Sequence, residues 1–298
     1  MLISNISSGS GLVLHWTFDP TVVFGCGALL AIYAGAVGFK LNLKGVLWGL
    51  GVLTIFISLT SPMHDLGERY LFSAHMLQHL LLLLVAAPLL VMGLPVGLLK
   101  RALKIKWVAQ VEKVLSQPLF AWFFSIGTLW VWHIPDLYNA ALTNHDIHIV
   151  EHLTFLISAV IFWWTGLKPI YRLQMNTIPA MLYFFFAALG SSILGLFLSF
   201  APTSLFPTYE NPIDTDNMLP LLRGEWNLTA AADQQIGGVM MWATGGFGYI
   251  TGIIVVMVRW YKRDQLKTYR ENMALELASE TKDAENEKSR LAGASSKA

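Results

Sequence analysis

The sequence predicts an all-α polytopic membrane protein with seven transmembrane helices, an N-terminus outside the cell and a C-terminus in the cytoplasm. Three observations predict it: an apolar composition, seven apolar runs and a one-sided distribution of basic residues. Of the 298 residues, 55% are hydrophobic and only 13% are charged, whereas a soluble domain of this size needs a more polar surface. Helix is the required form, because lipid-facing backbone must pair within its own segment and no alternating barrel pattern is present.

Seven apolar runs approach the length of about 20 residues that a helix needs to cross a hydrocarbon core. In chain order they are Thr21–Phe39, Gly45–Ser61, Leu71–Met92, Pro118–His133, Ile147–Leu167, Ile178–Phe200 and Gln235–Trp260. Pro179 suits the first turn of the sixth run, whereas Pro88 inside the third run is expected to bend that helix. Tryptophans at span ends, among them Trp130, Trp163 and Trp260, fit the interfacial belts of a bilayer.

The basic residues predict the orientation. The connections after the first, third and fifth runs, together with the C-terminal tail, hold 18 of the 20 Lys and Arg residues. Only Arg69 and Arg223 lie on the opposite side. Because short loops rich in Lys and Arg stay in the cytoplasm, the N-terminus is expected outside. The organisation that follows is an extracytoplasmic segment, a seven-helix membrane domain and a charged cytoplasmic tail, at residues 1–20, 21–260 and 261–298.

Charge and cysteine content exclude several classes of protein. The net charge of +1 gives no sign of a nucleic-acid partner. A single cysteine, Cys26, excludes an internal disulfide framework and a Cys-rich metal cage. No Lys or Arg precedes Lys40, so the basic region of a signal peptide is missing and the N-terminal segment is expected to be retained.

The histidines form the main chemical signal. All eight fall on the predicted outer side, although Lys and Arg alone set the topology. "SAHMLQHLLLLL" contains His75 and His79, and "IHIVEHLTFLI" contains His148 and His152. Since residues i and i+4 project from one helical face, each pair can present two imidazoles in one direction. His79 is expected about 10 Å inside its span, where a histidine must face protein, water or a metal.

Two such pairs at one depth, with two more histidines close by, favour a metal site. Neutral imidazole is a nitrogen donor for copper or zinc. A polar patch that binds loop carbonyls is the alternative for either pair taken alone. The predicted ligands are His75, His79, His148, His152, His64 and His133.

Five other side chains are candidate auxiliary groups. Gln78 and Glu151 precede the second His of each pair, about 100° round the helix, and are expected to orient ligands rather than to bind first. The sulfur atoms of Met76 and Cys26 favour Cu(I) over zinc, although such residues are more often packing residues in a membrane core. Asp233 opens "DQQIGGVMMW", where it either joins the site or caps the seventh helix.

Four other functions are weighed against a copper carrier. "HIVEH" matches the H-x-x-E-H pattern of a zinc-hydrolase class, with Glu151 as general base. Paired histidines on different helices can also ligate haem iron. A retinal-type receptor is disfavoured, because the seventh run has no lysine for a Schiff base. A copper-free scaffold would use its histidines for hydrogen bonding alone.

Three ordered blocks carry a resemblance to a known family. "SPMHDLGERYLFSAHMLQHLLLLLVAAPLLVMGLP", "WHIPDLYNAALTNHDIHIVEH" and "AADQQIGGVMMW" together resemble the CtaG-type assembly factors of cytochrome c oxidase found in bacilli and their relatives. The resemblance covers nearly the whole membrane portion, from Asp19 to Trp260. The family's characteristic positions correspond here to His64, His75, His79, His133, His148, His152 and Asp233. An unrelated single-span copper protein shares the family's name, but this sequence lacks its cysteine pattern.

The resemblance implies a multi-pass protein of the bacterial plasma membrane that is needed to make an active oxidase. It would bring copper to the haem–copper centre of the catalytic subunit. We therefore expect a non-catalytic copper chaperone, with the cytochrome c oxidase catalytic subunit and the lipid bilayer as partners and no nucleic acid. A homo-oligomer is left open. Copper would bind in an outward-facing pocket between the third, fourth and fifth helices, where His donors permit stepwise ligand exchange.

Overall fold

The computed structural model describes residues 15–38, 42–170 and 173–295. These residues form helices and turns without a strand, which confirms the all-α fold class. Contacts divide the chain after Ile253 into a body and a second unit, which are described separately. Most of the predicted extracytoplasmic segment, residues 1–14, lies outside the described residues.

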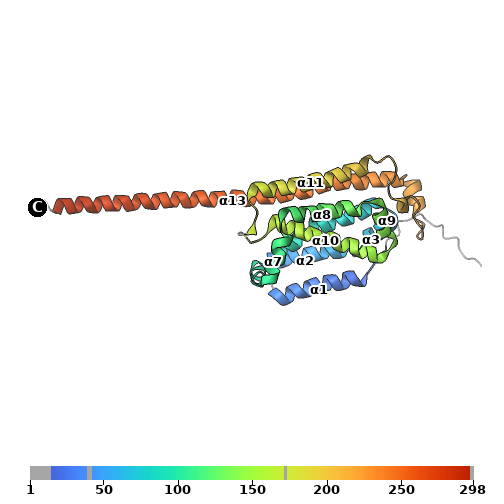
Figure 1. Ribbon diagram of the computed structural model, residues 1–298, viewed down its shortest axis with the longest axis horizontal. Helices are drawn as coiled ribbons and strands as arrows, with labels where there is room; N and C mark the ends of the chain where they lie inside the picture. Colours follow the sequence, from blue (N-terminus) through green and yellow to red (C-terminus); the bar gives the residue numbers. More distant parts are fainter. Residues whose placement is uncertain (1–14, 39–41, 171–172, 296–298) are drawn as a thin grey trace, which may run out of the picture. The chain divides into compact units, whose positions relative to one another are not determined.

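The described residues form thirteen α-helices and two π-helical turns (Figure 1). They are α1 (Pro20–Val37), α2 (Leu43–Thr60), α3 (Pro62–Arg69), α4 (Phe72–Leu81), η1 (Leu82–Ala86), α5 (Ala87–Gly93), α6 (Val96–Ala102), α7 (Lys106–Leu115), α8 (Pro118–Trp132), α9 (Pro135–Thr143), α10 (His145–Leu167), α11 (Thr177–Phe200), α12 (Pro207–Glu210), η3 (Pro220–Glu225) and α13 (Ala230–Ser295). Proline opens α1, α3, α8, α9 and α12, where its missing N–H is not needed. The side chains of Asp19, Asn42 and Asn144 cap α1, α2 and α10.

Six of the described helical segments are long and apolar enough to cross a membrane. They are α1, α2, the continuous segment Phe72–Gly93, α10, α11 and the first part of α13. The first five begin and end within two residues of the predicted runs. The described residues therefore fit a multi-pass membrane protein with six candidate spans, or seven if the bent pair α7 and α8 counts as one.

The predicted fourth span, Pro118–His133, corresponds to α8 and is shorter than the other spans. Its 15 residues extend about 22 Å, less than the hydrocarbon thickness of about 30 Å. The preceding helix α7 meets it at an angle of 64°. Seven spans is thus the upper end of what the described residues support, with α7 and α8 as a broken span.

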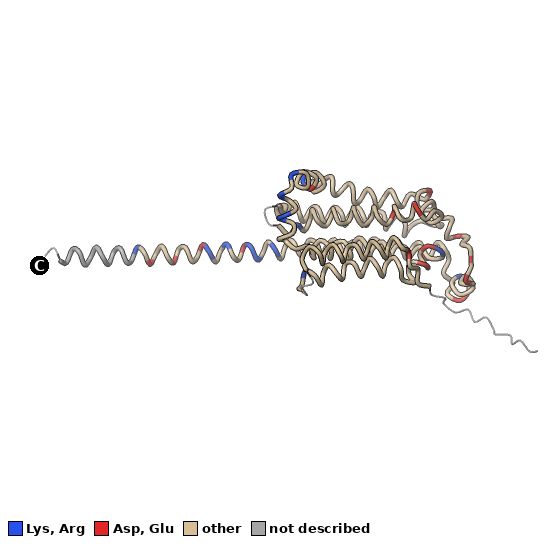
Figure 2. Tube along the Cα trace, turned by 90° about the horizontal axis from the view of Figure 1, so that it is seen from below, with Lys and Arg blue, Asp and Glu red and all other residues tan. Residues whose placement is uncertain are grey.

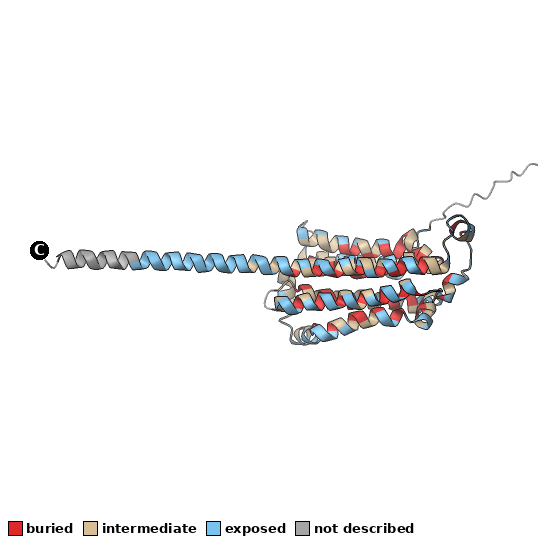
Figure 3. Ribbon diagram, turned by 90° about the horizontal axis from the view of Figure 1, so that it is seen from above, coloured by how far each residue is buried: buried red, intermediate tan, exposed pale blue. Residues whose placement is uncertain are grey.

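The seventh predicted run, Gln235–Trp260, is part of a longer helix. α13 begins at Ala230 and continues to Ser295, so no helix end separates the apolar run from the charged tail. In the second unit, residues 264–282 are exposed (Figure 3). This exposure fits the composition of the tail, which mixes charged residues of both signs.

Charged residues lie at the two ends of the body (Figure 2). Most of its Lys and Arg residues gather at one end, and most of its Asp and Glu residues gather at the other. The histidines of α3 and those at the starts of α4 and α10, which are predicted metal ligands, lie near the acidic end. The direction in which the body crosses the membrane stays a prediction from this separation.

The helix α10 lies in the interior of the body, packed against α8, α9, η1 and α5. α2 packs against α5, and α1 packs against α2 at one edge (Figure 1). The edge helix is mostly exposed, and Cys26 is its one buried residue. α4 and α10 therefore form the buried centre of the fold, while α1 covers one side of it.

Pro88 has a specific effect on the third span. Ala87 donates its N–H to Leu82 in the π-helical turn η1, so the usual partner of the Leu83 carbonyl is diverted. The next residue is Pro88, which has no N–H to give. The Leu83 carbonyl instead accepts a 2.7 Å hydrogen bond from Nε1 of Trp163 on α10. The proline thus creates a backbone acceptor that joins α10 to the third span.

Replacing Trp163 with Phe should destabilise the fold by about 1–3 kcal/mol, because a buried carbonyl then lacks a donor. SDS-driven unfolding of the purified protein in mixed micelles measures the loss. Trp130→Phe is the control, since Trp130 donates to Gly190 inside the regular helix α11, where that carbonyl keeps its backbone donor. An equal loss in the two variants would contradict the role given to η1.

Candidate functional site

The two histidine pairs face each other across the contact between α4 and α10. The Nε2 atoms of His75 and His79 lie 2.9 Å apart. The ring centroids of His75 and His148 are 5.5 Å apart, and those of His79 and His152 are 5.4 Å apart. All four side chains are buried. The structure thus brings four of the six predicted ligands together in one interior cluster.

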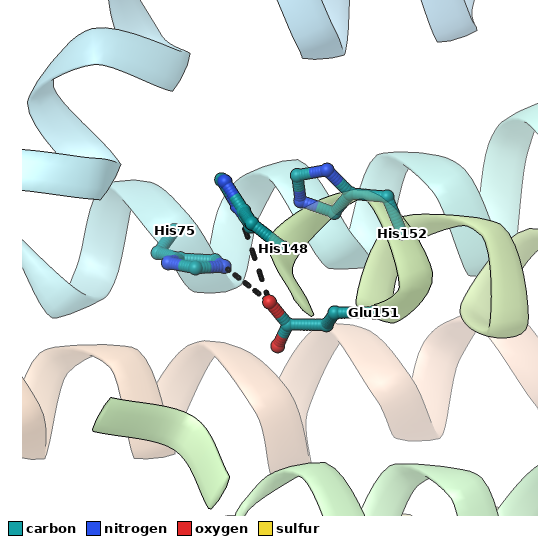
Figure 4. Close-up of side chains that lie close together, drawn as sticks. All are labelled: His75, His148, Glu151 and His152. Carbon is teal, nitrogen blue, oxygen red and sulfur yellow. Dashed lines mark ion pairs between the residues drawn. The ribbon is translucent and has the colours of Figure 1, made fainter. Parts of the chain in front are cut away.

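Glu151 lies inside this cluster and is fully buried. Its Oε2 lies 3.8 Å from Nε2 of His75 and 3.9 Å from Nε2 of His148. Dashed lines in Figure 4 mark these two ion pairs. Its Oε1 lies 3.8 Å from Nε2 of His79. Among the described residues, neither carboxylate oxygen has a hydrogen-bond partner. The sequence suggested an orienting role for Glu151, but its position is central, and we call the whole set the inner cluster: His75, His79, His148, Glu151 and His152.

The inner cluster fits a metal ion. Ligand atoms of His75, His148, Glu151 and His152 all lie within 4.8 Å of one another. Donors on a tetrahedral ion with bonds of 2.0–2.1 Å lie about 3.3 Å apart, so a small contraction completes the set. A buried carboxylate without a donor is costly unless a cation or proton neutralises it. Three imidazoles and one carboxylate suit Cu(II) or Zn(II).

Tyr209 on α12 fixes the orientation of His75. Burial raises its pKa well above the ordinary value, so its hydroxyl is neutral. The hydroxyl donates to the Gly67 carbonyl at 2.6 Å. It then accepts from Nδ1 of His75 at 3.2 Å and from the Tyr138 hydroxyl at 3.1 Å. A proton on Nδ1 leaves a lone pair on Nε2 of His75, which faces Nε2 of His79 at 2.9 Å. This lone pair can bind an ion once that hydrogen bond is exchanged.

Glu68 on α3 fixes the orientation of His148. Its Oε1 lies 2.5 Å from Nδ1 of His148, and its Oε2 lies 3.5 Å from Nε2 of His64. Burial alone would raise the pKa of Glu68, but the hydrogen bond from His148 and the nearby imidazoles lower it below its ordinary value. Burial lowers the pKa of His64, which favours its neutral form. We call this second candidate set the outer group: His64, Glu68 and His148.

The sequence analysis did not select Glu68 or the two tyrosines as site residues. Glu68 follows His64 by four residues, so the i, i+4 rule that selected the histidine pairs could have found it. Tyr209 and Tyr138 carry no such signal. They contact His75 from segments 134 and 63 residues away in the sequence, and only the fold brings them close.

Gln78 lies between His152 of the inner cluster and His64 of the outer group. Its Nε2 donates to Nε2 of His152 at 2.9 Å, and its Oε1 faces Nδ1 of His64 at 3.4 Å. Both groups of a single buried amide are therefore used to hold imidazoles. For His152 to bind an ion through Nε2, this hydrogen bond must be exchanged.

His133 and Met76 contact each other and lie outside both candidate sets. Nδ1 of His133 donates to the Leu129 carbonyl at 2.7 Å, and its Nε2 lies 3.2 Å from the Met76 sulfur. Both ring nitrogens are thus already engaged. The structure does not bring His133 together with the inner cluster, although its sequence position predicted this.

Asp233 caps a helix, but not the one that its sequence position indicates. Its carboxylate accepts from the backbone N–H of Phe72 at 2.6 Å and from that of Ser73 at 3.3 Å. It also accepts from the Ser73 hydroxyl. These N–H groups belong to the first turn of α4, which carries His75 and His79. Asp233 therefore positions the ligand helix and is absent from both candidate sets.

Gly67 allows α3 to approach α4 closely. A Cβ added at Gly67 would lie 2.8 Å from the backbone nitrogen of His75. Such a contact with backbone cannot be relieved by a side-chain rotation. The glycine thus permits the Tyr209 bridge, in which one hydroxyl contacts both Gly67 and His75.

A cleft of about 440 Å³ lies between α1, α2 and α10. Its wall is mainly apolar and includes Cys26, whose thiol lies 3.9 Å from the Val52 carbonyl. Its polar residues are Asp19, Thr21, His64, Glu68, His145, His148 and His152. Among the described residues, the lining does not include His75, His79 or Glu151. Cys26 therefore lies on the cleft side and not inside the inner cluster.

This access pattern disfavours the hydrolase hypothesis. A general base must reach the water that attacks the substrate. Glu151 is fully buried and does not line the cleft, whereas His148 and His152 do. The carboxylate of the "HIVEH" motif is placed where it can contact an ion but not a substrate in this cleft.

Comparison with known proteins identifies the family. Residues 39–263 match the family described as cytochrome c oxidase caa3 assembly factor (Caa3_CtaG). An uncharacterized protein of Mycobacterium leprae is 25% identical over 249 residues, which make up 76% of this chain and 35% of the relative. Uncharacterized proteins of Mycobacterium bovis and Mycobacterium tuberculosis are each 24% identical over 282 residues, 86% of this chain and 41% of the relative.

The chain thus spans less than half the length of the curated relatives it matches. No solved structure matches it. The family match covers well over half of the chain and includes both candidate metal sets. The chain belongs to the cytochrome c oxidase caa3 assembly factor family.

Proposed function

We propose that the chain is a copper carrier that supplies the catalytic subunit during assembly of the oxidase. Copper is its cargo, held in the inner cluster and released to a membrane partner. The family description supports a role in oxidase assembly and a non-enzymatic function. The positive-inside rule supports a cluster that faces outward, because it lies at the end of the body away from most Lys and Arg residues (Figure 2).

The state of Glu151 carries the proposal. Its carboxylate is fully buried and three imidazoles surround it. Within the part of the chain that the structure describes, both of its oxygens lack a hydrogen-bond partner. Nε2 of His148 is also buried without a partner, and so is Nδ1 of His79. A polar network built only for stability would satisfy these atoms. A cation bound between Glu151 and Nε2 of His148 would satisfy both groups.

The donor set also suits a carrier rather than a permanent structural site. Structural zinc sites are typically closed by several thiolates, and the inner cluster contains none. Imidazole ligands can be exchanged one at a time, and each is held by a hydrogen-bonding partner when it is not bound to metal. Copper can therefore leave the cluster without disrupting the helices that surround it.

Metal analysis of the purified full chain tests the proposal. Wild type, His79→Ala, Glu151→Gln and Asp146→Asn are loaded with Cu(I), Cu(II) or Zn(II), desalted and analysed for bound metal. Wild type should retain copper. Glu151→Gln should lose most of it, because it removes one of the four grouped donors. His79→Ala should also lose copper, because Nε2 of His79 contacts Nε2 of His75 at 2.9 Å and lies 3.8 Å from Glu151.

Asp146→Asn is the matched control. Asp146 is an exposed carboxylate on α10, outside both candidate sets and the cleft lining. Its loss changes the local charge without removing a donor, so copper content should stay at the wild-type level. Equal copper content in all four proteins would contradict the carrier and leave the scaffold interpretation.

A further inference from the structure

The inner cluster and the outer group share one residue, His148, and differ in their access to solvent. The side chain of Glu68 is 30% exposed, whereas that of Glu151 is 0% exposed. His64 and Glu68 line the cleft together with His148 and His152. His79 borders a separate cavity of about 20 Å³, on the side of α8 and α13. The cleft thus leads to the outer group first.

Two residues of the inner cluster are reached from the cleft, and both are histidines of α10. His152 is held by the amide of Gln78 through its Nε2. His148 has Nδ1 against Glu68 at 2.5 Å, and its Nε2 is directed to Glu151 at 3.9 Å without a hydrogen-bond partner. The two nitrogens of this one ring therefore face the two candidate sets.

We infer that the outer group is a second copper station, which receives the ion from the cleft and passes it to the inner cluster through His148. This inference rests on the proposed function, since it describes how the cargo reaches the cluster. The outer group consists of two imidazoles and a carboxylate within 4.8 Å of one another, which is one imidazole fewer than the set His75, His148, Glu151 and His152. Fewer ligands and greater exposure give weaker binding and faster exchange, as a receiving station requires.

Because the two stations share the imidazole of His148, copper can occupy only one of them at a time. A neutral imidazole carries one N–H, so it offers one lone pair at a time. When copper occupies the outer group, Nδ1 of His148 binds the ion and the proton sits on Nε2, which faces Glu151. When copper occupies the inner cluster, Nε2 binds the ion and the proton sits on Nδ1, where Glu68 accepts it. One proton changes nitrogen for each transfer, and no electron is exchanged.

Copper binding and uptake in four variants test this inference. Glu68→Gln, Glu151→Gln, the double variant and Asp146→Asn are compared with the wild-type full chain in detergent. Equilibrium dialysis against Cu(II) gives affinity and stoichiometry. Transfer of Cu(II) from a chromophoric chelator, followed by absorbance in a stopped-flow instrument, gives the rate of uptake. Unchanged SDS unfolding midpoints verify that each variant is folded.

The expected results separate the two stations. Wild type and Asp146→Asn bind one copper tightly. Glu151→Gln keeps one weaker copper, which the double variant loses, because the outer group is then the remaining station. Glu68→Gln binds copper at equilibrium but takes it up about 10–100-fold more slowly, a range typical for loss of a residue that supports a metal ligand.

The results that would contradict copper transfer through the outer group differ from those that would contradict the copper carrier itself. If Glu151→Gln binds no copper and Glu68→Gln takes it up at the wild-type rate, the outer group is not a station, while the inner cluster stands. If Glu151→Gln binds like wild type and Glu68→Gln abolishes binding, copper sits in the outer group alone. The carrier built on the inner cluster is then wrong.

Discussion

Replacing Tyr209 with Phe is expected to weaken copper binding by about 10–100-fold without removing a ligand. The lost hydroxyl is the acceptor for Nδ1 of His75 and the donor to the Gly67 carbonyl. Without it, His75 loses the hydroxyl that favours a proton on Nδ1, and the tautomer that blocks Nε2 becomes more populated. The Tyr138 hydroxyl also loses its buried partner. Equilibrium competition with a copper chelator measures the change in affinity.

Tyr183→Phe is the matched control for this prediction. It removes another buried tyrosine hydroxyl, which donates to the Phe162 carbonyl at 3.2 Å and touches neither candidate set. Both variants are expected to lose some stability, but only Tyr209→Phe should lose copper affinity. Unchanged affinity in Tyr209→Phe would mean that His75 adopts its binding tautomer without help from α12.

Glu112→Ala is expected to cause the largest loss of stability, about 3–5 kcal/mol, because it leaves a buried charge without its partner. The Lys168 ammonium follows α10, is buried, and lies 2.9 Å from Oε1 of Glu112 on α7. The Ser116 hydroxyl accepts from the same ammonium at 2.8 Å, and Trp164 donates to the Glu112 carboxylate at 3.0 Å. SDS-driven unfolding in mixed micelles measures the loss.

Two control variants test whether the loss of stability in Glu112→Ala comes from breaking the buried ion pair. Glu112→Gln keeps an acceptor oxygen for Lys168 and Trp164 and should be milder. Glu271→Ala breaks the exposed pair of Lys267 and Glu271, whose side chains are 75% and 61% exposed, and should produce no measurable change. A Glu112→Ala protein as stable as Glu271→Ala would show that α7 is not held to α10 by this pair.

Hydropathy predicted most of the fold, because a membrane-spanning helix is required wherever a long apolar run must satisfy its own backbone. Hydropathy did not predict features of the helices that depend on the path of the backbone rather than on composition. The 64° bend between α7 and α8 is one such feature. The end of α13 is another, since helix formation there continues past Trp260 into charged residues, which hydropathy separates from the apolar run.

The candidate site could be predicted to the extent that helical periodicity governs it. The i, i+4 spacing selected His75, His79, His148 and His152, which the fold brings together on α4 and α10. It could not reveal that Glu151 turns inward, because the direction of a side chain depends on the helix packed against it. Likewise, Asp233 was expected at its own helix, but its carboxylate caps α4 across 161 residues of sequence.

The separation of the cleft from the innermost ligands has a chemical consequence for a cell that handles copper. Loose copper ions react with peroxide to form radicals and are captured by soluble thiols. The cleft wall includes His148 and His152 but not His75 or Glu151. Cargo held on the side of His75 and Glu151 would therefore be less open to both reactions than cargo held at the cleft wall.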